Sequence, residues 1–406
     1  MALEPTAAAC QDGAVSARRT LVAVSVVASV VLLAGCAGSD DEDASDGSSG
    51  SPSASGSPSG TDSPAPTLDT GTPSEPSSPV PAPGPVTPTA AEEIVTGLDA
   101  PWSIAFLPDG SALVTQRDEG TIVLVDDTGS VTPVGAVPGV DGEGEGGLLG
   151  IAFDPRSPST LYVYATMGSQ NVVQRTTYAD GALGPFEVVI DGIPAGTRHD
   201  GGRLLFGPDD MLYISTGESG NPEDAQDLER LGGKILRMTP AGEVPADNPF
   251  PGSPIWSFGH RNIEGLAFDD DGQLWASEFG DRAADELNRI QAGANYGWPD
   301  VEGIAGDERY VDPVVEWRPT AEASPSGLAY VRDTFFVAAL RGERLWQVPY
   351  VDGAAGSPVA FVEDYGRLRD AVVAPDGTLW VLTNNTDGRG DAREGDDRIL
   401  RLTLSP

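Results

Sequence analysis

Two histidines are the only imidazole side chains in this 406-residue chain, and each lies in a dense polar string bounded by glycine. His199 stands in the string RHDGGRL at residues 198–204, and His260 stands in GHRN at residues 259–262. Imidazole is the side chain best suited to transfer a proton near neutral pH. These two strings are therefore the first candidates for proton-transfer chemistry.

Glu218, in the string TGESG at residues 216–220, is the acid that we expect to accompany His199. A carboxylate that accepts a hydrogen bond from one imidazole nitrogen fixes the tautomer and leaves the other nitrogen basic. The sequence thus predicts a general-base pair. The alternative is that His199 only hydrogen-bonds to the backbone of a loop.

Arginines form a second candidate group beside the expected loops, namely Arg261, Arg341, Arg367 and Arg369. Arg367 and Arg369 alternate in a predicted strand, which would point both guanidinium groups to one face. Like charges on one face of an acidic protein indicate a bound anion, most readily carboxylates gripped in bidentate fashion. Salt bridges to the abundant Asp and Glu are the alternative.

A third group combines acids with a glycine-rich loop. The string DELN at residues 285–288 is followed by GANYGWP at residues 293–299. Acid side chains beside free carbonyls suit an oxygen-ligand Ca²⁺ site, although no EF-hand spacing is present.

A recurring turn signal indicates the elements that must position these groups. Six apolar runs each end in a Pro, Asp or Gly turn that leads into a second β-rich segment. The turns lie at residues 106–110, 153–156, 206–210, 268–272, 330–333 and 373–377. The pattern predicts an all-β fold, a six-bladed β-propeller of four-stranded blades whose loops converge on one end of a central axis. A β-sandwich or two tandem barrels would explain the recurring spacing less well.

The N-terminal region differs in composition from this body. Residues 1–35 have the layout of a bacterial signal peptide, and LAGC at residues 33–36 resembles the lipobox of bacterial lipoproteins, so we expect Cys36 to carry lipid. Residues 36–90 are rich in Ser, Pro and Gly, carry acidic but no basic side chains, and read as a disordered tether. Residues 91–406 would form the propeller. We therefore expect an extracytoplasmic lipoprotein anchored to the cell membrane.

The formal net charge of −38 bears on the partners of the protein. Most of its surface would repel nucleic acid and anionic lipid. We expect no nucleic-acid partner, and contact with the membrane only through the lipid anchor.

Taken together, the motifs resemble one known family. The strings EGGLLG, RHDGGRLLFGPD, GGKILRM, SFGHRN, DELNRI, GANYGWP, PSGLAY, ALRGERL and RLRD occur in the order typical of the glucose/sorbosone dehydrogenase family, which includes soluble quinoprotein glucose dehydrogenase and the aldose sugar dehydrogenases. The resemblance spans about residues 95–404. It implies a six-bladed propeller that holds pyrroloquinoline quinone (PQQ) and oxidises an aldose at its anomeric hydroxyl.

The resemblance also implies a role for individual residues. His199 would be the catalytic base that takes the hydroxyl proton, with Glu218 as its supporting acid. Arg261 would stabilise the oxyanion that hydride addition creates on the quinone. The expected cofactor contacts are Glu145, Arg261, Asn262, Thr320, Arg341, Arg367 and Arg369, where Glu145 replaces a glutamine and Arg341 a lysine of the glucose enzyme.

For Ca²⁺ the resemblance implies two sets of ligands. One ion on the quinone would be held by the carbonyls of Gly280 and Asp281, but this segment departs from the glucose enzyme, which has glutamine at the position of Phe279 and proline at that of Asp281. A structural ion at the Glu286 side chain and the Tyr296 carbonyl matches better.

Two other functions stay open at this point. A propeller lactonase would use Ca²⁺ to activate water, and it would need acid and amide ligands at the axis rather than four arginines. A carbohydrate-binding propeller without chemistry would take up no quinone. The aldose and the electron acceptor are left open by the sequence.

Overall fold

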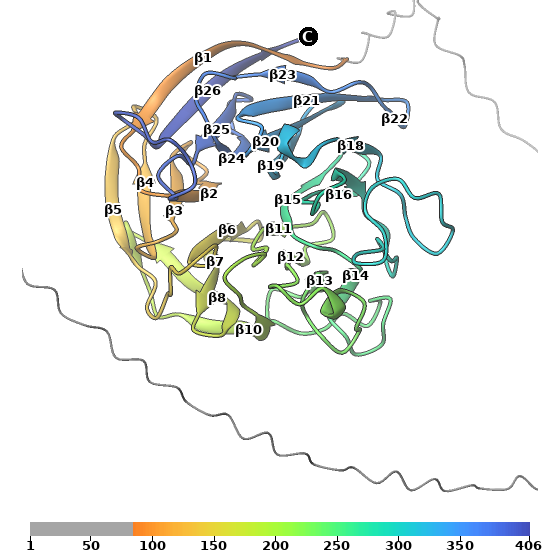
Figure 1. Ribbon diagram of the computed structural model, residues 1–406. Helices are drawn as coiled ribbons and strands as arrows, with labels where there is room; N and C mark the ends of the chain where they lie inside the picture. Colours follow the sequence, from red (N-terminus) through yellow and green to blue (C-terminus); the bar gives the residue numbers. More distant parts are fainter. Residues whose placement is uncertain (1–83) are drawn as a thin grey trace, which may run out of the picture. The chain divides into compact units, whose positions relative to one another are not determined.

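The computed structural model describes residues 84–406, which form six antiparallel β-sheets arranged in a ring (Figure 1). This confirms the predicted all-β, six-bladed propeller. The predicted signal peptide, Cys36 and most of the predicted tether lie outside the described residues. Within residues 84–406, no helix could serve as a transmembrane segment.

The blades follow one another around the ring in chain order. The first contains β2 (Pro101–Phe106), β3 (Ala112–Gln116), β4 (Thr121–Val125) and β5 (Val131–Ala136). The second contains β6 (Leu148–Asp154), β7 (Ser157–Met167), β8 (Gln170–Ala179), the short β9 (Ala182–Leu183) and β10 (Glu187–Pro194). The third contains β11 (Leu204–Phe206), β12 (Leu212–Ser215), β13 (Lys234–Met238) and β14 (Ile255–Phe258).

The remaining three blades complete the ring. The fourth contains β15 (Ile263–Phe268), β16 (Leu274–Glu278), β17 (Asp285–Arg289) and β18 (Val315–Trp317). The fifth contains β19 (Pro325–Tyr330), β20 (Thr334–Ala339), β21 (Arg344–Val351), the short β22 (Ala354–Ala355) and β23 (Val359–Phe361). The sixth contains β24 (Leu368–Val373), β25 (Leu379–Thr383), β26 (Arg398–Ser405) and β1 (Thr87–Thr96).

The sixth blade closes the ring by joining the two ends of the described chain. β1 pairs antiparallel with β26, from Thr87 opposite Ser405 to Thr96 opposite Arg398. β1 begins inside the segment whose composition predicts a tether, so residues 87–90 belong to a blade. Pairing of β1 with β26 supplies the outermost strand that the C-terminal hairpins lack.

The six turns predicted from the sequence all connect the first strand of a blade to its second. Aspartates stabilise five of the six locally, because a carboxylate can accept the N–H two residues further on. Asp109 Oδ1 accepts the Ser111 N–H at 3.0 Å, and Asp376 Oδ1 accepts the Thr378 N–H at 2.9 Å. The sequence repeat is therefore the repeat of the inner hairpin.

Apolar side chains between neighbouring blades form the core. Between the second and third blades, Tyr162 and Tyr164 of β7 pack in one cluster with Leu212 and Ile214 of β12. Each such fully buried side chain contributes about 1.5–3 kcal/mol. The blades are thus held to one another by side-chain packing.

The strand directions decide where the loops lie. β2, β6, β11, β15, β19 and β24 lie nearest the centre of the ring (Figure 1). Because each blade is antiparallel, the loop that enters its first strand and the loop between its second and third strands open at the end opposite the six turns. The described 3₁₀ helices, η1 (Pro222–Ala225) and η2 (Thr320–Glu322), both occur in loops at this end.

Candidate active site at the loop end of the axis

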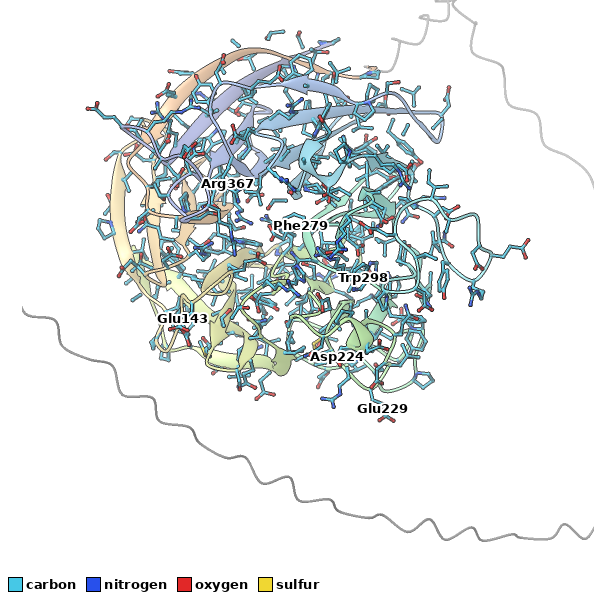
Figure 2. All side chains as sticks on the ribbon, in the orientation of Figure 1. Glu143, Asp224, Glu229, Phe279, Trp298 and Arg367 are labelled. Carbon is cyan, nitrogen blue, oxygen red and sulfur yellow. The ribbon has the colours of Figure 1, made fainter. Side chains whose placement is uncertain are left out.

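A polar cavity of about 270 Å³ lies at the loop end of the propeller. Figure 2 shows Phe279 and Arg367, two of its lining residues, near the centre of the ring. Loops of the second, fourth, fifth and sixth blades contribute to its wall. The charged side chains that line it are Glu145, Arg261, Glu264, Asp281, Arg341, Arg367, Arg369 and Arg389.

His199 lies in the loop between β10 and β11, and the structure brings it together with Glu218, which follows β12. The His199 Nδ1 atom hydrogen-bonds with Glu218 Oε1, and both side chains are buried. This contact engages Nδ1 and leaves Nε2 as the nitrogen that can take up a proton. The pair that the sequence predicts is therefore present as a hydrogen-bonded unit.

The backbone of His199 adopts a left-handed conformation, with φ +60°. Such a conformation is uncommon for a residue with a side chain and persists where the surroundings fix it. Here the His199 N–H donates to Glu145 Oε2 at 2.6 Å, and its carbonyl accepts the Ser219 N–H at 3.0 Å. Gly217 permits this packing, since a Cβ there would lie 1.9 Å from the His199 carbonyl oxygen.

Glu145 also contacts an arginine that the sequence analysis missed. Arg389, in the loop between β25 and β26, places Nη2 3.2 Å from Glu145 Oε1 and lines the polar cavity. The available sequence signal was its position between Gly388 and Gly390, because glycines also stand next to the polar strings that carry His199 and His260. Glu145 thus joins a loop of the second blade to a loop of the sixth.

Arg261 lies between β14 and β15 and reaches the cavity. Its Nη2 atom lies 3.2 Å from Asp281 Oδ1, and its guanidinium carbon lies 5.3 Å from the Trp298 ring centroid. Its Nε is buried and has no partner among the described residues. The Arg261 Nε–H is therefore a free donor that could hydrogen-bond to a bound anion.

Asn262 has a different environment from its neighbour. It is fully buried and does not line the cavity. Its Oδ1 accepts the Gly201 N–H at 3.0 Å, and its Nδ2 donates to Glu264 Oε1 at 3.2 Å. In this structure Asn262, predicted as a cofactor contact, holds the loop that carries His199.

His260, the other histidine, is buried in the loop between β14 and β15, which leads into the fourth blade. Its Nδ1 lies 2.8 Å from Glu278 Oε2, its Nε2 lies 2.9 Å from Ser257 Oγ, and its ring stacks on Tyr296. Glu278 in turn accepts the Arg261 N–H at 2.6 Å. His260 is completely buried, so it supports Arg261 through Glu278.

Arg367 and Arg369 both face the cavity from the start of β24, as their alternation predicts. Arg367 Nη2 lies 3.2 Å from Asp387 Oδ2, and Arg369 pairs with Glu264 and donates to Asn384 Oδ1 at 3.0 Å. Burial would raise the pKa of Asp387, but Arg369 and Arg367 lower it more, so the pKa lies below its usual value. The Arg367 Nε is buried without a partner among the described residues.

Arg341 and Thr320 complete the predicted cofactor contacts. Arg341, between β20 and β21, lines the cavity and is exposed. Thr320 begins η2, is buried and also lines the cavity. All the predicted contacts except Asn262 therefore lie around one space, and its arginines outnumber its acids. This donor set fits a ligand with several carboxylates.

The residues expected to hold Ca²⁺ lie in and beside the fourth blade. Among residues 84–406, no group of three or more His, Cys, Asp or Glu is arranged to hold a metal. Gly280 and Asp281 line the cavity, and within the described chain no donor reaches either carbonyl. These free carbonyls fit an oxygen-liganded cation.

Glu286 and Tyr296 are the second expected pair. Glu286 Oε1 accepts the Gly303 N–H at 2.7 Å, its Oε2 accepts from Asn288 Nδ2 at 2.9 Å, and burial, reinforced by Glu278, raises its pKa to about 8. The neighbouring Asn288 Oδ1 is buried without a partner in the described chain. The unpaired Asn288 Oδ1 beside the buried Glu286 carboxyl therefore also fits a site for an oxygen-liganded cation.

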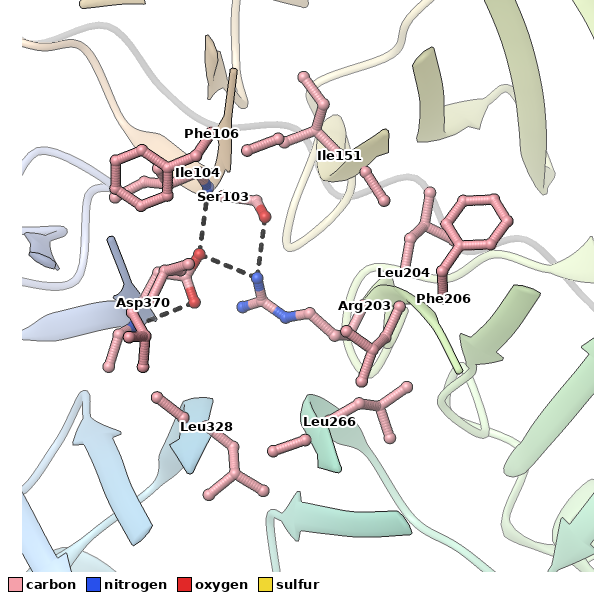
Figure 3. Close-up of a pocket in the computed structure, with 18 of the residues that line it drawn as sticks. Ser103, Ile104, Phe106, Ile151, Arg203, Leu204, Phe206, Leu266, Leu328 and Asp370 are labelled. Atoms are coloured by element: carbon pink, nitrogen blue, oxygen red, sulfur yellow. Dashed lines mark hydrogen bonds and ion pairs between the residues drawn. The ribbon is translucent and has the colours of Figure 1, made fainter. Parts of the chain in front are cut away.

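A second, larger cavity of about 470 Å³ lies at the turn end of the axis (Figure 3). Its wall is mainly aliphatic and aromatic and comes from the first strands of all six blades. At its centre Arg203 Nη1 donates to Asp370 Oδ2 at 2.9 Å and to Ser103 Oγ at 2.8 Å, and Arg203 Nε donates to the Glu264 carbonyl at 2.8 Å. Since the Glu264 side chain lines the polar cavity, these contacts link the two cavities. Most of the charged side chains singled out from the sequence line the polar cavity, and His199 is joined to its wall through Glu145.

Comparisons with known proteins agree with this geometry. The family model described as glucose/sorbosone dehydrogenase matches residues 98–400. The aldose sugar dehydrogenase YliI of Escherichia coli is 33% identical over 335 residues, covering 72% of this chain and 89% of that protein. Quinoprotein glucose dehydrogenase B of Acinetobacter calcoaceticus is 35% identical over 257 residues, covering 53% of this chain and 54% of that protein.

A solved structure is more similar still. The PQQ-bound form of the aldose sugar dehydrogenase from Streptomyces coelicolor superposes with a TM-score of 0.76 at 52% identity. The match covers 80% of this chain and 99% of that one. The likeness therefore extends over the whole propeller.

Proposed function

The chain belongs to the glucose/sorbosone dehydrogenase family, and from that premise we propose that it oxidises an aldose at its anomeric hydroxyl to the lactone, with PQQ as cofactor. The family includes quinoprotein sugar oxidoreductases, and this chain is one of them. The observation that carries the proposal is a buried His199–Glu218 pair that is hydrogen-bonded, through the His199 N–H, to Glu145 in the wall of a cavity lined by five arginines.

The cavity residues support the binding of PQQ. PQQ is a tricarboxylate, and Arg341, Arg367, Arg369 and Arg389 would hold its carboxylates, while Arg261 would stabilise negative charge on it. The unpaired, buried Nε atoms of Arg261 and Arg367 are donors that such an anion would satisfy. When bound, PQQ supplies the acceptor for the hydride that leaves the sugar.

His199 would act as the base at its Nε2 atom. With Nδ1–H donating to the Glu218 carboxylate across their hydrogen bond, Nε2 would carry the lone pair that takes the anomeric hydroxyl proton. The Glu218 carboxylate then stabilises the charged imidazole. Glu145 orients the ring through the His199 backbone N–H.

We extend the proposal to Ca²⁺ at the Gly280 and Asp281 carbonyls, with a structural ion at Glu286 and the Tyr296 carbonyl. The support is that these carbonyls have no donor in the described chain. Ca²⁺ at the first site would add positive charge beside the cofactor.

The test is to mix purified apoprotein with PQQ and Ca²⁺ and to assay an aldose panel with an artificial electron acceptor. We expect acceptor reduction that depends on PQQ. Hydrolysis of sugar lactones without PQQ would instead identify the lactonase, and sugar binding with no quinone uptake would identify a binding propeller; either result would overturn the proposal.

A variant tests the role of His199. His199→Ala should lower kcat by about 10²–10⁴-fold while PQQ still binds. Arg198→Ala is the matched control, because Arg198 is the exposed neighbour in the same loop. Near-normal turnover by His199→Ala would remove the proposed base.

We also propose that the protein is extracytoplasmic and held to the cell membrane by lipid on Cys36. The support is the LAGC string at residues 33–36. Cys36→Ser should move the protein from the membrane fraction to the soluble fraction. Unchanged membrane association would contradict the anchor.

A further inference from the structure

Glu302 lies outside the polar cavity, yet its carboxylate organises part of the cavity wall. Its Oε1 atom accepts the backbone N–H groups of four successive residues, at distances of 2.7, 2.9, 2.8 and 3.1 Å. The donors are Asp281, Arg282, Ala283 and Ala284. Successive N–H groups that converge on one anion form a nest, and bonds to a charged acceptor are stronger than neutral ones.

The N–H group that precedes these four is held in a related way. Gly280 donates its N–H to Asp285 Oδ1 at 2.8 Å, and Asp285 Oδ2 accepts the Ser324 N–H at 2.7 Å. All N–H groups of residues 280–284 are therefore taken by two carboxylates. No N–H group of this loop is free, so the loop can form other backbone hydrogen bonds only by breaking these.

Gly280 is matched to Glu302. A Cβ at this position would lie 2.5 Å from Glu302 Oε1 and 1.9 Å from the Ala284 carbonyl oxygen. Any side chain at residue 280 would therefore push the carboxylate out of the nest. The glycine and the glutamate depend on each other.

The loop that Glu302 holds is the one that faces the cavity. Phe279, Gly280 and Asp281 line it, and Asp281 Oδ1 lies 3.2 Å from Arg261 Nη2. With the N–H groups engaged by Glu302 and Asp285, the carbonyls of Gly280 and Asp281 have no donor in the described chain.

We propose that Glu302 is a positioning residue that fixes residues 280–284 in the shape that presents two free carbonyls and the Asp281–Arg261 pair to a cation and an anionic cofactor. This inference rests on the proposed function for the identity of the ligands. The ordering of the loop itself does not.

The experiment compares Glu302→Ala and Glu302→Gln with Glu308→Gln, an exposed glutamate of the same connection between β17 and β18. The first readout is hydrogen exchange of the amides of residues 281–284 in the apoprotein. We expect exchange about tenfold faster or more in Glu302→Ala, a smaller change in Glu302→Gln, which keeps an acceptor oxygen, and none in Glu308→Gln. Amides of the first blade should be unchanged in all three, which separates loop ordering from global destabilisation.

The second readout is the Ca²⁺ concentration needed for half-maximal PQQ binding, followed by PQQ absorbance or fluorescence. Loss of a residue that orients metal ligands typically costs about 10–100-fold in metal affinity, so we expect a rise of at least about tenfold in Glu302→Ala. Unchanged exchange, or unchanged Ca²⁺ dependence in a protein that binds PQQ, would overturn the proposal. If the unaltered protein binds no PQQ, the proposed function fails, and the exchange measurement still decides the role of Glu302.

Discussion

Glu145 and His199 are joined by a 2.6 Å hydrogen bond between the Glu145 carboxylate and the His199 backbone N–H, although 54 residues separate them in the chain. The bond ties a residue with left-handed backbone conformation to Glu145, which lines the polar cavity. The same carboxylate pairs with Arg389. Glu145 therefore contacts the proposed base and an arginine of the cavity at once.

Glu145→Gln should bind PQQ more tightly than the unaltered protein. The amide oxygen can still accept the His199 N–H, whereas the negative charge that opposes a tricarboxylate is lost and Arg389 is freed to contact it. Removing one nearby like charge corresponds to about 1 kcal/mol, or about fivefold in Kd. Fluorescence titration with PQQ checks this, with the exposed Glu143→Gln as control. Weaker binding by Glu145→Gln would show that its charge holds the site together.

Glu218→Gln should lower kcat without a comparable change in PQQ affinity. The variant keeps a hydrogen-bonding side chain beside His199 Nδ1 but loses the charge that stabilises a protonated imidazole. We expect a decrease of at least about tenfold, within the range for general-base assistance. Steady-state kinetics with saturating aldose measure it. A kcat within twofold of normal would mean that the carboxylate only orients the ring.

Arg203→Met should destabilise the propeller strongly. It leaves Asp370 buried without its cation and the Glu264 carbonyl without its donor. Removing one partner of a buried ion pair costs about 3–5 kcal/mol. Urea unfolding measures the difference, with Arg309→Met as control because the Arg309–Asp307 pair is largely exposed. If both variants lost the same free energy of unfolding, the buried Arg203–Asp370 pair would be no more important for stability than the exposed pair.

Asp200→Asn should change how stability depends on pH. Burial raises the pKa of Asp200 to about 6, although Gly196 and Asn171 donate to its Oδ1. Because the folded pKa lies above the unfolded value of 3.8, the folded state binds the proton more tightly between pH 4 and 6. The stability that Asp200 contributes is thus present below about pH 4 and is lost as pH rises through about 6.

Asparagine keeps the accepting oxygen and cannot ionise. The free energy of unfolding of the variant, relative to that of the unaltered protein, should therefore rise by about 2 kcal/mol when the pH is raised from 4 to 7. This is somewhat less than the full pKa shift of Asp200 would give. Urea unfolding at both pH values measures the gain. A difference that is the same at pH 4 and pH 7 would show that Asp200 stays charged throughout.

Much of the fold followed from local sequence. Each of the six turns has its own Pro, Asp or Gly signal, and five of them have an aspartate whose carboxylate accepts the N–H two residues further on, so these inner hairpins are specified within about ten residues. The closure of the ring was not predictable in the same way. β1 and β26 lie at opposite ends of the described chain, and nothing in either segment alone specifies that they pair.

The sequence by itself determined the family, the six blades, and the residue types that could do chemistry, because motif order and turn chemistry are properties of the chain. Tertiary structure decided which of them meet. It joined His199 to Glu145 and placed Arg389 in the wall of the cavity. It also buried Asn262 and brought the Glu302 carboxylate to the N–H groups of residues 281–284. The physical reason is that closure of the ring brings loops of different blades together at one end of the axis. The spacing of residues along the chain does not show which of these loops come into contact.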